Sequence, residues 1–253
     1  MIFLMVICAI FFHMCLIWGW YIYQKNPSVV DVGWASGLIL VSLVYLYNSA
    51  ISPRTMTLSC VLLLWGFRLG FYLWYTRIRH GIIDKRYVTL SENWKLAKPL
   101  GFFFNFQLQG LLILLISLPW YFVAKSNQQH MSSLDWAILF LAVIAIIGET
   151  CADHQLMRFK KHHAGAVCNQ GLWFYSRHPN YFFEWLTWCF FYMFALLTPL
   201  GWMGFISPLT LYVIMTRITG PMTEAGSMKS KGPLYLAYQQ STPMFFPKLW
   251  RYK

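Results

Sequence analysis

The sequence predicts an all-α, polytopic integral membrane protein with about seven transmembrane helices, and three observations support this prediction. Of the 253 residues, 58% are hydrophobic and only 11% are charged, which is roughly half the charged fraction of an ordinary soluble domain. The mean hydropathy is positive, at +0.49. Several apolar runs reach about 20 residues, the length that lets a helix cross a bilayer.

The expected spans lie near residues 2–23, 29–48, 56–76, 101–123, 133–152, 181–197 and 200–218. The breaks between them, such as "QKNP", "NSAISPR" and "LTPLG", carry the Pro, Asn and Ser residues that end helices. The first run starts at Met1 without a basic region or a small-residue cleavage site, so we expect a retained span and not a signal peptide. We see no internal repeat, and we expect residues 1–253 to form a single transmembrane domain.

The basic residues predict an orientation for these spans. Sixteen Lys and Arg residues fall in the loops on the side of the C-terminus, and two, Arg54 and Lys125, fall in the loops on the other side. The positive-inside rule then predicts an outside N-terminus and a cytoplasmic C-terminus. The long loops 77–100 and 153–180 share the cytoplasmic side, so a soluble cosubstrate is expected to enter from there.

The net charge of +12 does not by itself predict a nucleic-acid partner. Topology and contact with anionic headgroups account for most of this charge, because the cations lie on one side of the membrane. The six cysteines are scattered, with neither a C-x-x-C pair nor a His/Cys cluster. The sequence therefore predicts neither a disulfide framework nor a metal site.

The stretch "YSRHPNYFFEW", residues 175–185, places polar side chains at the start of an apolar helix. If Pro179 takes the first helical position, Asn180 and Glu184 are spaced i, i+4 and share one face. A carboxylate inside a span costs a few kcal/mol unless it is paired or hydrated. We favour a functional polar pocket here over a helix cap with a Glu paired to an interfacial cation.

A second polar stripe lies in "GETCADHQLMRFKKHH", where Glu149 and Asp153 are also spaced i, i+4. The helix then runs into a basic cluster of Arg158, Lys160, Lys161, His162 and His163. Together the carboxylates, the amide and the cations suit a ligand with one phosphorylated end and one amide or ribose end. Contact with lipid headgroups explains the basic cluster alone equally well.

Other charges within the apolar runs leave two interpretations open. Asp31 and Arg68 either pair with each other or act in catalysis, and Arg217 either caps a helix or touches a ligand anion. Tyr87, in the loop "DKRYVTLSENW", lies beside basic residues that suit a general acid, although most loop tyrosines have no such role. No GxGxxG or P-loop motif is present, so any nucleotide site must be built from membrane helices and their loops.

"GLWFYSRHPNYFFEW" resembles the Arg-His-Pro-x-Tyr…Glu signature of membrane enzymes with a steroid 5α-reductase C-terminal domain. The resemblance is strongest to bacterial members of unassigned substrate. It extends over about residues 28–248, through stretches at Val29–Trp34, Leu64–Leu69, Asp84–Tyr87 and Phe103–Gly110 and through the C-terminal tail. The RHPxY part alone is shared with isoprenylcysteine and phospholipid methyltransferases.

The resemblance implies seven membrane helices that enclose NADPH on the cytoplasmic side, in a bacterial inner membrane. It implies hydride transfer to the β-carbon of an enone in a steroid-like or other lipid substrate. The positions that match the family's cofactor-binding residues, with Lys160 expected at the phosphates, are Glu149, Asp153, Lys160, Tyr175, Arg177, His178, Asn180, Tyr181, Glu184, Arg217 and Glu224.

One departure from the family concerns the proton donor. Steroid-reducing members carry a Gln-Glu pair in an early helix and a Tyr that polarise the substrate carbonyl, and this chain has no such pair. The candidate catalytic residues are therefore Tyr87 and a protonated Asp31. The alternatives are an S-adenosylmethionine-dependent methyltransferase, or a non-catalytic lipid-binding or transport protein. Transport is disfavoured because the polar stripes form no path across the membrane.

Overall fold

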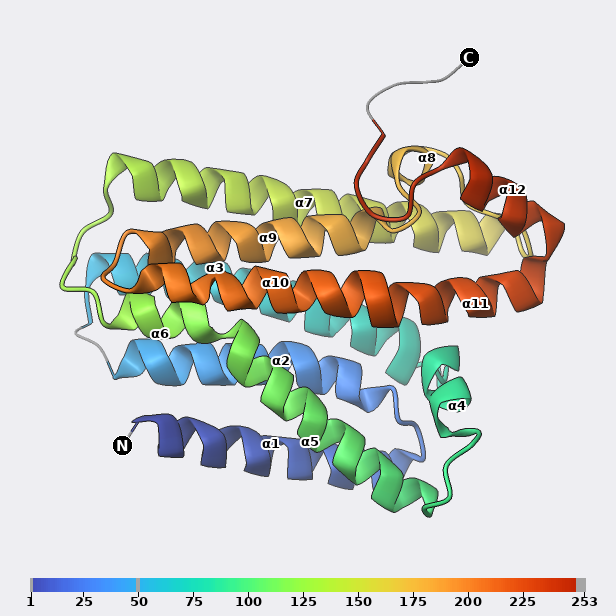
Figure 1. The fold of residues 1–253 in the computed structure, drawn as a ribbon, viewed down its shortest axis with the longest axis horizontal. Helices are drawn as coiled ribbons and strands as arrows, with labels where there is room; N and C mark the ends of the chain where they lie inside the picture. The colour runs from blue at the N-terminus through green and yellow to red at the C-terminus, as the bar shows by residue number, and fades with distance from the viewer. Residues whose placement is uncertain (1, 49–50, 249–253) are drawn as a thin grey trace. The chain divides into compact units, whose positions relative to one another are not determined.

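The computed structural model describes residues 2–48 and 51–248, and within these ranges every regular element is a helix (Figure 1). Two of the cations counted for the orientation, Arg251 and Lys253, lie outside the described residues. The chain divides into two compact units. Unit 1 is Met1–Ile138 with Phe191–Thr210, and unit 2 is Leu139–Phe190 with Leu211–Lys253. The expected single transmembrane domain stays a prediction.

Unit 1 is built from the first helices of the chain and one short later segment. Within it α2 lies between α1 and α3 and also packs against α5 and α6 (Figure 1). Its elements are α1 (Ile2–Gln24), α2 (Val29–Tyr47), α3 (Pro53–Leu73), the π-helix η1 (Trp74–Ile78), α4 (Lys85–Ser91), α5 (Lys98–Ile116), α6 (Leu118–Ala124) and the 3-10 helix η2 (Gly201–Phe205).

Unit 2 is centred on α7 and α9, which run side by side (Figure 1). The first residues of α7, the end of α9 and the start of α10 belong to unit 1. The elements are α7 (Ser133–His162), α8 (Leu172–Tyr175), α9 (Pro179–Leu196), α10 (Ile206–Val213), the π-helix η3 (Ile214–Thr219), α11 (Gly220–Lys231) and α12 (Pro233–Ser241).

Five of the described helices are long and apolar enough to cross a membrane, which identifies an all-helical membrane protein. They are α1, α2, the continuous helix Pro53–Ile78, α5 and α7. Helices also lie over the other two expected segments, 181–197 and 200–218. α9 carries polar residues in its first turns, and the last segment is divided among η2, α10 and η3.

The expected span 101–123 is interrupted at Ser117, where α5 ends and α6 begins. Pro119 is the second residue of α6 and has no backbone N–H to donate, so a single helix cannot run through this position without losing a hydrogen bond. The resulting break was not predicted from the hydropathy.

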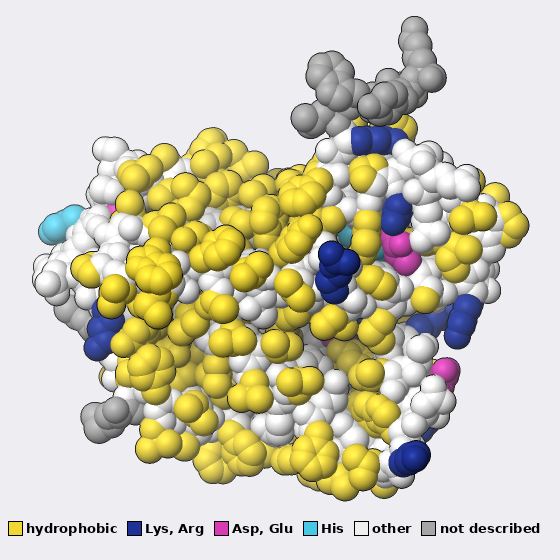
Figure 2. Space-filling model, in the orientation of Figure 1, with side chains coloured by type: hydrophobic (Ala, Val, Ile, Leu, Met, Phe, Trp, Pro, Cys, Tyr) yellow, Lys and Arg dark blue, Asp and Glu magenta, His cyan; other side chains and the backbone are white. Residues whose placement is uncertain are grey.

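The outer surface of α5 is apolar. Leu100, Phe104, Leu108, Leu111 and Leu115 are all exposed and recur every three or four residues, on one side of the helix. Hydrophobic side chains also cover much of the drawn face along α5 and α6 (Figure 2). A soluble helix would expose its polar side instead, so this stripe is a surface suited to lipid.

Small residues let the helices of unit 1 approach closely. A Cβ added to Gly37 of α2 would lie 2.8 Å from Ile113 of α5, and one added to Gly110 of α5 would lie 3.2 Å from Met14 of α1. Such contacts stabilise packing where lipid removes the hydrophobic drive for helix association. α2 is therefore held tightly, which fixes the position of Asp31 near its start.

Candidate functional site

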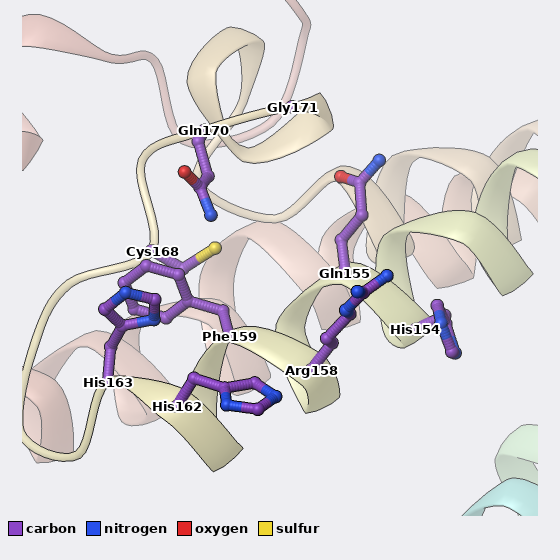
Figure 3. A pocket seen from close by; sticks show the side chains of 9 residues that line it. All are labelled: His154, Gln155, Arg158, Phe159, His162, His163, Cys168, Gln170 and Gly171. Carbon is purple, nitrogen blue, oxygen red and sulfur yellow. The ribbon is translucent and has the colours of Figure 1, made fainter.

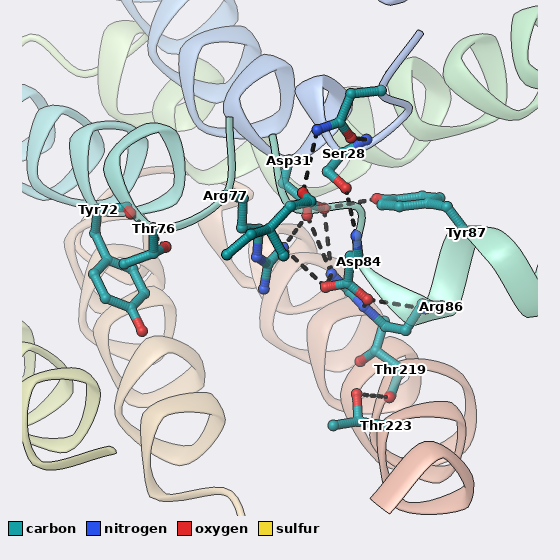
Figure 4. Close-up of polar contacts among 12 residues, drawn as sticks. Ser28, Asp31, Tyr72, Thr76, Arg77, Asp84, Arg86, Tyr87, Thr219 and Thr223 are labelled. Carbon is teal, nitrogen blue, oxygen red and sulfur yellow. Dashed lines mark hydrogen bonds and ion pairs between the residues drawn. The ribbon is translucent and has the colours of Figure 1, made fainter. Parts of the chain in front are cut away.

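The first polar cluster lies in unit 1 around Asp31, in the first turn of α2 (Figure 4). Tyr87 of α4 donates a hydrogen bond of 2.6 Å to Asp31 Oδ1. Arg86 Nη2 lies 3.2 Å from Asp31 Oδ2, and Arg77 Nη1 pairs with the same oxygen. The two candidate catalytic residues are thus in direct contact, and the carboxylate accepts hydrogen bonds from all three partners.

The loop before α4 brings these donors to Asp31. Asp84 caps α4 by accepting a 2.9 Å hydrogen bond from the backbone N–H of Arg86. Ser28 Oγ accepts a 2.8 Å hydrogen bond from the Asp84 N–H, and Asn26 Nδ2 donates to the carbonyl of Ile82 at 3.1 Å. The loop is therefore tied at two points to the turn between α1 and α2.

Burial and neighbouring charge act on the pKa of two groups in this cluster, Tyr87 and Asp84. The pKa of Tyr87 is raised well above its ordinary value, first by burial and then by the neighbouring charge of Asp31. Burial alone would raise the pKa of Asp84, but Arg86 and Arg77 outweigh this and hold it below its ordinary value. Tyr87 therefore keeps its proton at neutral pH.

Asp31 has two other cations beside it, and its pairing with Arg68 stays a prediction. The ion pairs of Asp31 go to Arg77, in the π-helix η1, and to Arg86, at the start of α4. Arg77 and Arg86 flank the loop that folds back onto α2, which is why they reach the carboxylate. π-helical turns are frequent at functional sites, so the position of Arg77 in η1 is consistent with a functional role for this cluster.

The second polar cluster lies in unit 2, on α7 and α9. Asn180 Nδ2 donates a 3.2 Å hydrogen bond to Asp153 Oδ1, so the two predicted stripes meet. Glu149, one turn before Asp153, and Glu184, one turn after Asn180, are also buried. Gly148 permits this approach, because a Cβ there would lie 2.6 Å from the ring of Phe183.

The amide of Asn180 is only half used by the protein. Its nitrogen donates to Asp153, whereas its oxygen is buried and has no hydrogen-bond partner among the described residues. A buried acceptor without a donor costs about 1–3 kcal/mol. The cluster therefore offers one acceptor and nearby carboxylates to a ligand that carries N–H or O–H groups.

The signature residues Arg177 and His178 form a third cluster with Glu224, also in unit 2. Arg177 Nε and Nη2 lie 2.6 and 3.0 Å from the two oxygens of Glu224, and His178 Nε2 lies 3.1 Å from Oε1. Arg177 Nη1 donates to the carbonyls of Gln239 and Thr242 at 3.0 and 2.6 Å. This arrangement ties the start of α9 to the C-terminal segment.

Glu224 is strongly held in its charged form. Burial alone would raise its pKa, but hydrogen bonds from His178, Arg177 and Gln239 lower the pKa to about 2. Gln239, which the sequence did not single out, donates to Glu224 Oε2 at 2.7 Å. Three of the guanidinium nitrogens of Arg177 donate hydrogen bonds to Glu224 and to the C-terminal backbone. In this structure Arg177 therefore positions the C-terminal segment.

The remaining predicted residues lie beside the third cluster or on the exposed surface. Tyr181 stacks on His178 with ring centroids 4.9 Å apart, and its hydroxyl lies 3.5 Å from Thr223 Oγ1. Tyr175, Lys160 and Arg217 are exposed, the last of them within the π-helix η3.

Sequence reasoning missed a pocket of about 480 Å³ in unit 2, between α7 and the loop that follows it (Figure 3). The sequence indicated only a basic cluster here, which included Arg158, His162 and His163. The structure shows that these three residues line a pocket together with Phe159, Cys168 and Gln170. The i, i+4, i+8 spacings of His154, Arg158 and His162 and of Gln155, Phe159 and His163 would have indicated a shared face. The described residues contain no group of three or more His, Cys, Asp or Glu placed to hold a metal ion.

The fold and these clusters define an all-helical membrane protein with buried polar sites on its helices. Residues 17–242 match the family model described as a protein of unknown function, DUF1295, and the chain belongs to that family. This family is related to steroid 5α-reductase-like proteins. The chain is similar to the uncharacterized protein C594.04c of Schizosaccharomyces pombe, with 29% identity over 272 residues, covering 92% of this chain and 76% of the yeast protein. No solved structure matches the chain.

Proposed function

We propose that this protein is a membrane-embedded reductase that uses NADPH to reduce the activated C=C bond of an enone in a steroid-like or other lipid substrate. The observation that carries the proposal is the Asn180 cluster, in which a buried amide oxygen lacks a donor among the described residues. The nicotinamide carboxamide would supply such a donor, and the nearby carboxylates would accept hydrogen bonds from ribose hydroxyls.

The cations further along α7 fit the other end of such a cofactor. Lys160 follows Asp153 by seven residues, or about 10 Å along a helix. It is exposed at the end of the helix, where a phosphate would be reached from water. Amide and carboxylate groups inside the span and a cation at its end thus match the polarity of a dinucleotide.

A reduced nicotinamide, when bound, supplies the hydride. The chain itself must supply the proton that completes the reduction, and Tyr87 is the proposed donor. Its buried phenol keeps its proton at neutral pH and already donates to Asp31. A preorganised donor in a site that excludes water stabilises the negative charge that develops on the oxygen of an enone.

The proposal includes a topology of seven spans with the N-terminus outside, in a bacterial inner membrane, and a cofactor site on the cytoplasmic side. Helices over all seven expected segments and the charge difference between the loops support it. α9 is less apolar than an ordinary span, and Asn180 and Glu184 contribute to this.

An S-adenosylmethionine-dependent methyltransferase of the isoprenylcysteine or phospholipid type is the second candidate. It is supported by the RHPxY motif at residues 177–181, which such methyltransferases share. The resemblance over nearly the whole chain favours the reductase.

The test is the thermal midpoint of the purified full-length protein with NADPH, NADH or S-adenosylmethionine added separately, since a ligand that binds the folded state raises it. We expect a rise with NADPH that is lost in Asn180→Ala. Asn105→Ala, an amide change on α5 of unit 1, is the matched control and should keep the rise. A rise with S-adenosylmethionine alone would overturn the reductase in favour of the methyltransferase.

A further inference from the structure

The pocket beside the end of α7 is walled by fixed parts of unit 2. Leu172 donates its backbone N–H to Gln155 Oε1 at 2.9 Å, and Trp173 Nε1 donates to the carbonyl of Ala152 at 2.9 Å. At the other end of the loop, His163 donates its N–H to the carbonyl of Phe159 of α7 at 2.9 Å. Both ends of the loop are therefore bound to α7.

One wall of the pocket carries nitrogen donors, and its base is aromatic. His154, Arg158 and His162 follow one another at successive turns of α7 and present a guanidinium between two imidazoles. Phe159 and His163 stack with ring centroids 4.6 Å apart and an interplanar angle of 17°. Figure 3 shows Cys168 and Gln170 of the loop directed into the same space.

No carboxylate lies among the lining residues to neutralise these donors. Unit 2 has four acidic residues among those described, and Glu149, Asp153, Glu184 and Glu224 are 3%, 4%, 6% and 7% exposed. Burial raises the pKa of the Cys168 thiol, so the loop side is neutral as well. The exposed charges around the pocket, on Arg158, Lys160 and Lys161, are all positive.

The length of α7 places this pocket just outside the hydrocarbon. The helix has 30 residues, or about 45 Å, against a hydrocarbon thickness of about 30 Å. Roughly ten residues therefore extend beyond the apolar layer, and the pocket lies on this extension. Both lipid headgroup phosphates and soluble phosphate esters are present at that depth.

We propose that this pocket binds a phosphate ester, with the phosphate on Arg158 and the adjacent imidazoles and the attached organic group against Phe159 and His163. The guanidinium offers paired donors that suit phosphate oxygens, and imidazole N–H groups add to them. The stacked rings suit a planar or apolar group. This binding site does not depend on the reductase proposal, which rests on Asn180.

The experiment uses the purified full-length protein and two probes. The soluble probe is AMP, compared with inorganic phosphate, and its Kd is measured by the shift of the thermal midpoint. The lipid probe is phosphatidic acid in phosphatidylcholine nanodiscs, compared with phosphatidylcholine alone. Arg158→Gln should weaken binding roughly tenfold or more, because it removes a charge-assisted hydrogen bond. Lys125→Gln removes the same charge from an exposed side chain of unit 1, outside the lining, and should change the Kd by less than about twofold.

The outcomes separate the two sources of the phosphate. Binding of AMP that is tighter than that of phosphate and is weakened in Phe159→Leu would assign a soluble nucleotide. Stabilisation by phosphatidic acid that is lost in Arg158→Gln would assign a headgroup. Absence of any shift with both probes, or equal losses in Arg158→Gln and Lys125→Gln, would overturn the pocket as a binding site. NADPH binding is measured separately, in the unaltered protein and in Asn180→Ala. The reductase proposal and the phosphate-ester proposal can therefore be overturned independently of each other.

Discussion

The phenol of Tyr87 donates a 2.6 Å hydrogen bond to the carboxylate of Asp31, which also pairs with Arg77 and Arg86. The pair joins α4 to the first turn of α2, 56 residues apart in the chain. Because Asp31 is balanced by two guanidiniums and Tyr87 is buried, the phenol is both held in place and kept protonated. Two consequences can be measured.

Tyr87→Phe removes the proposed proton donor and leaves the ring packing in place. We expect NADPH-dependent reduction of an enone lipid to fall by about 100-fold or more, the usual contribution of a general acid. NADPH binding should persist, because the Asn180 cluster is unchanged. Tyr23→Phe, at a tyrosine that is 84% exposed, is the control. Full activity in Tyr87→Phe would remove Tyr87 from the mechanism.

Asp31→Asn should be more damaging to the fold than Tyr87→Phe. It leaves Arg77 and Arg86 beside each other with one shared counterion, Asp84. Losing one partner of a largely buried ion pair costs about 3 kcal/mol or more. The measurement is the thermal midpoint in detergent, and equal midpoints for the two variants would contradict this account.

The low pKa of Glu224 predicts a loss of stability in acid. Its pKa is about 2 in the folded protein against an ordinary value of 4.5, so the stabilisation is fully present above 4.5. It is lost as the pH falls from 4.5 towards 2, because the unfolded chain takes up the proton first. A shift of this size corresponds to about 3 kcal/mol, and solvent screening lowers this contribution.

Glu224→Gln isolates this effect, because glutamine does not titrate. The thermal midpoint of Glu224→Gln should lie below that of the unaltered protein at pH 7, and the gap should narrow between pH 5 and about pH 2. Glu92→Gln, at an exposed carboxylate on unit 1, is the control and should leave the pH profile unchanged. A gap that is constant with pH would show that Glu224 does not titrate in this window.

The contact between Gly148 and Phe183 makes a structural prediction for α7 and α9. Gly148→Ala would place a Cβ 2.6 Å from the Phe183 ring, so the helices or the ring must move. We expect a loss of about 1–3 kcal/mol, as for other overpacked sites. The double variant Gly148→Ala with Phe183→Leu should recover part of the thermal midpoint. Gly226→Ala, where nothing lies within 4 Å, should have little effect.

Much of the secondary structure was predictable from the chain. Apolar runs and their polar breaks predicted helices over all seven segments, because a helix that crosses lipid needs about 20 predominantly apolar residues. The break at Ser117 and the π-helices η1 and η3 were missed. Hydropathy records the polarity of a segment, whereas these features depend on which backbone hydrogen bonds are made.

The i, i+4 spacing of Asn180 with Glu184 and of Glu149 with Asp153 placed each pair on one helical face. Only the packing of α9 against α7 brought Asn180 onto Asp153. In the same way, Tyr87 and Asp31 were named as candidates separately, and the folded loop before α4 made them partners.

Sequence alone therefore determined the class of protein and which residues are chemically unusual for a membrane helix, since both follow from local polarity. Tertiary structure decided which partner each charged group takes. Among the cations of the sequence, Asp31 pairs with Arg77 and Arg86. Arg177 donates its hydrogen bonds to Glu224 and to the C-terminal backbone. The physical reason is that an ion pair requires atoms within a few ångströms, and packing between segments distant in the chain sets that distance.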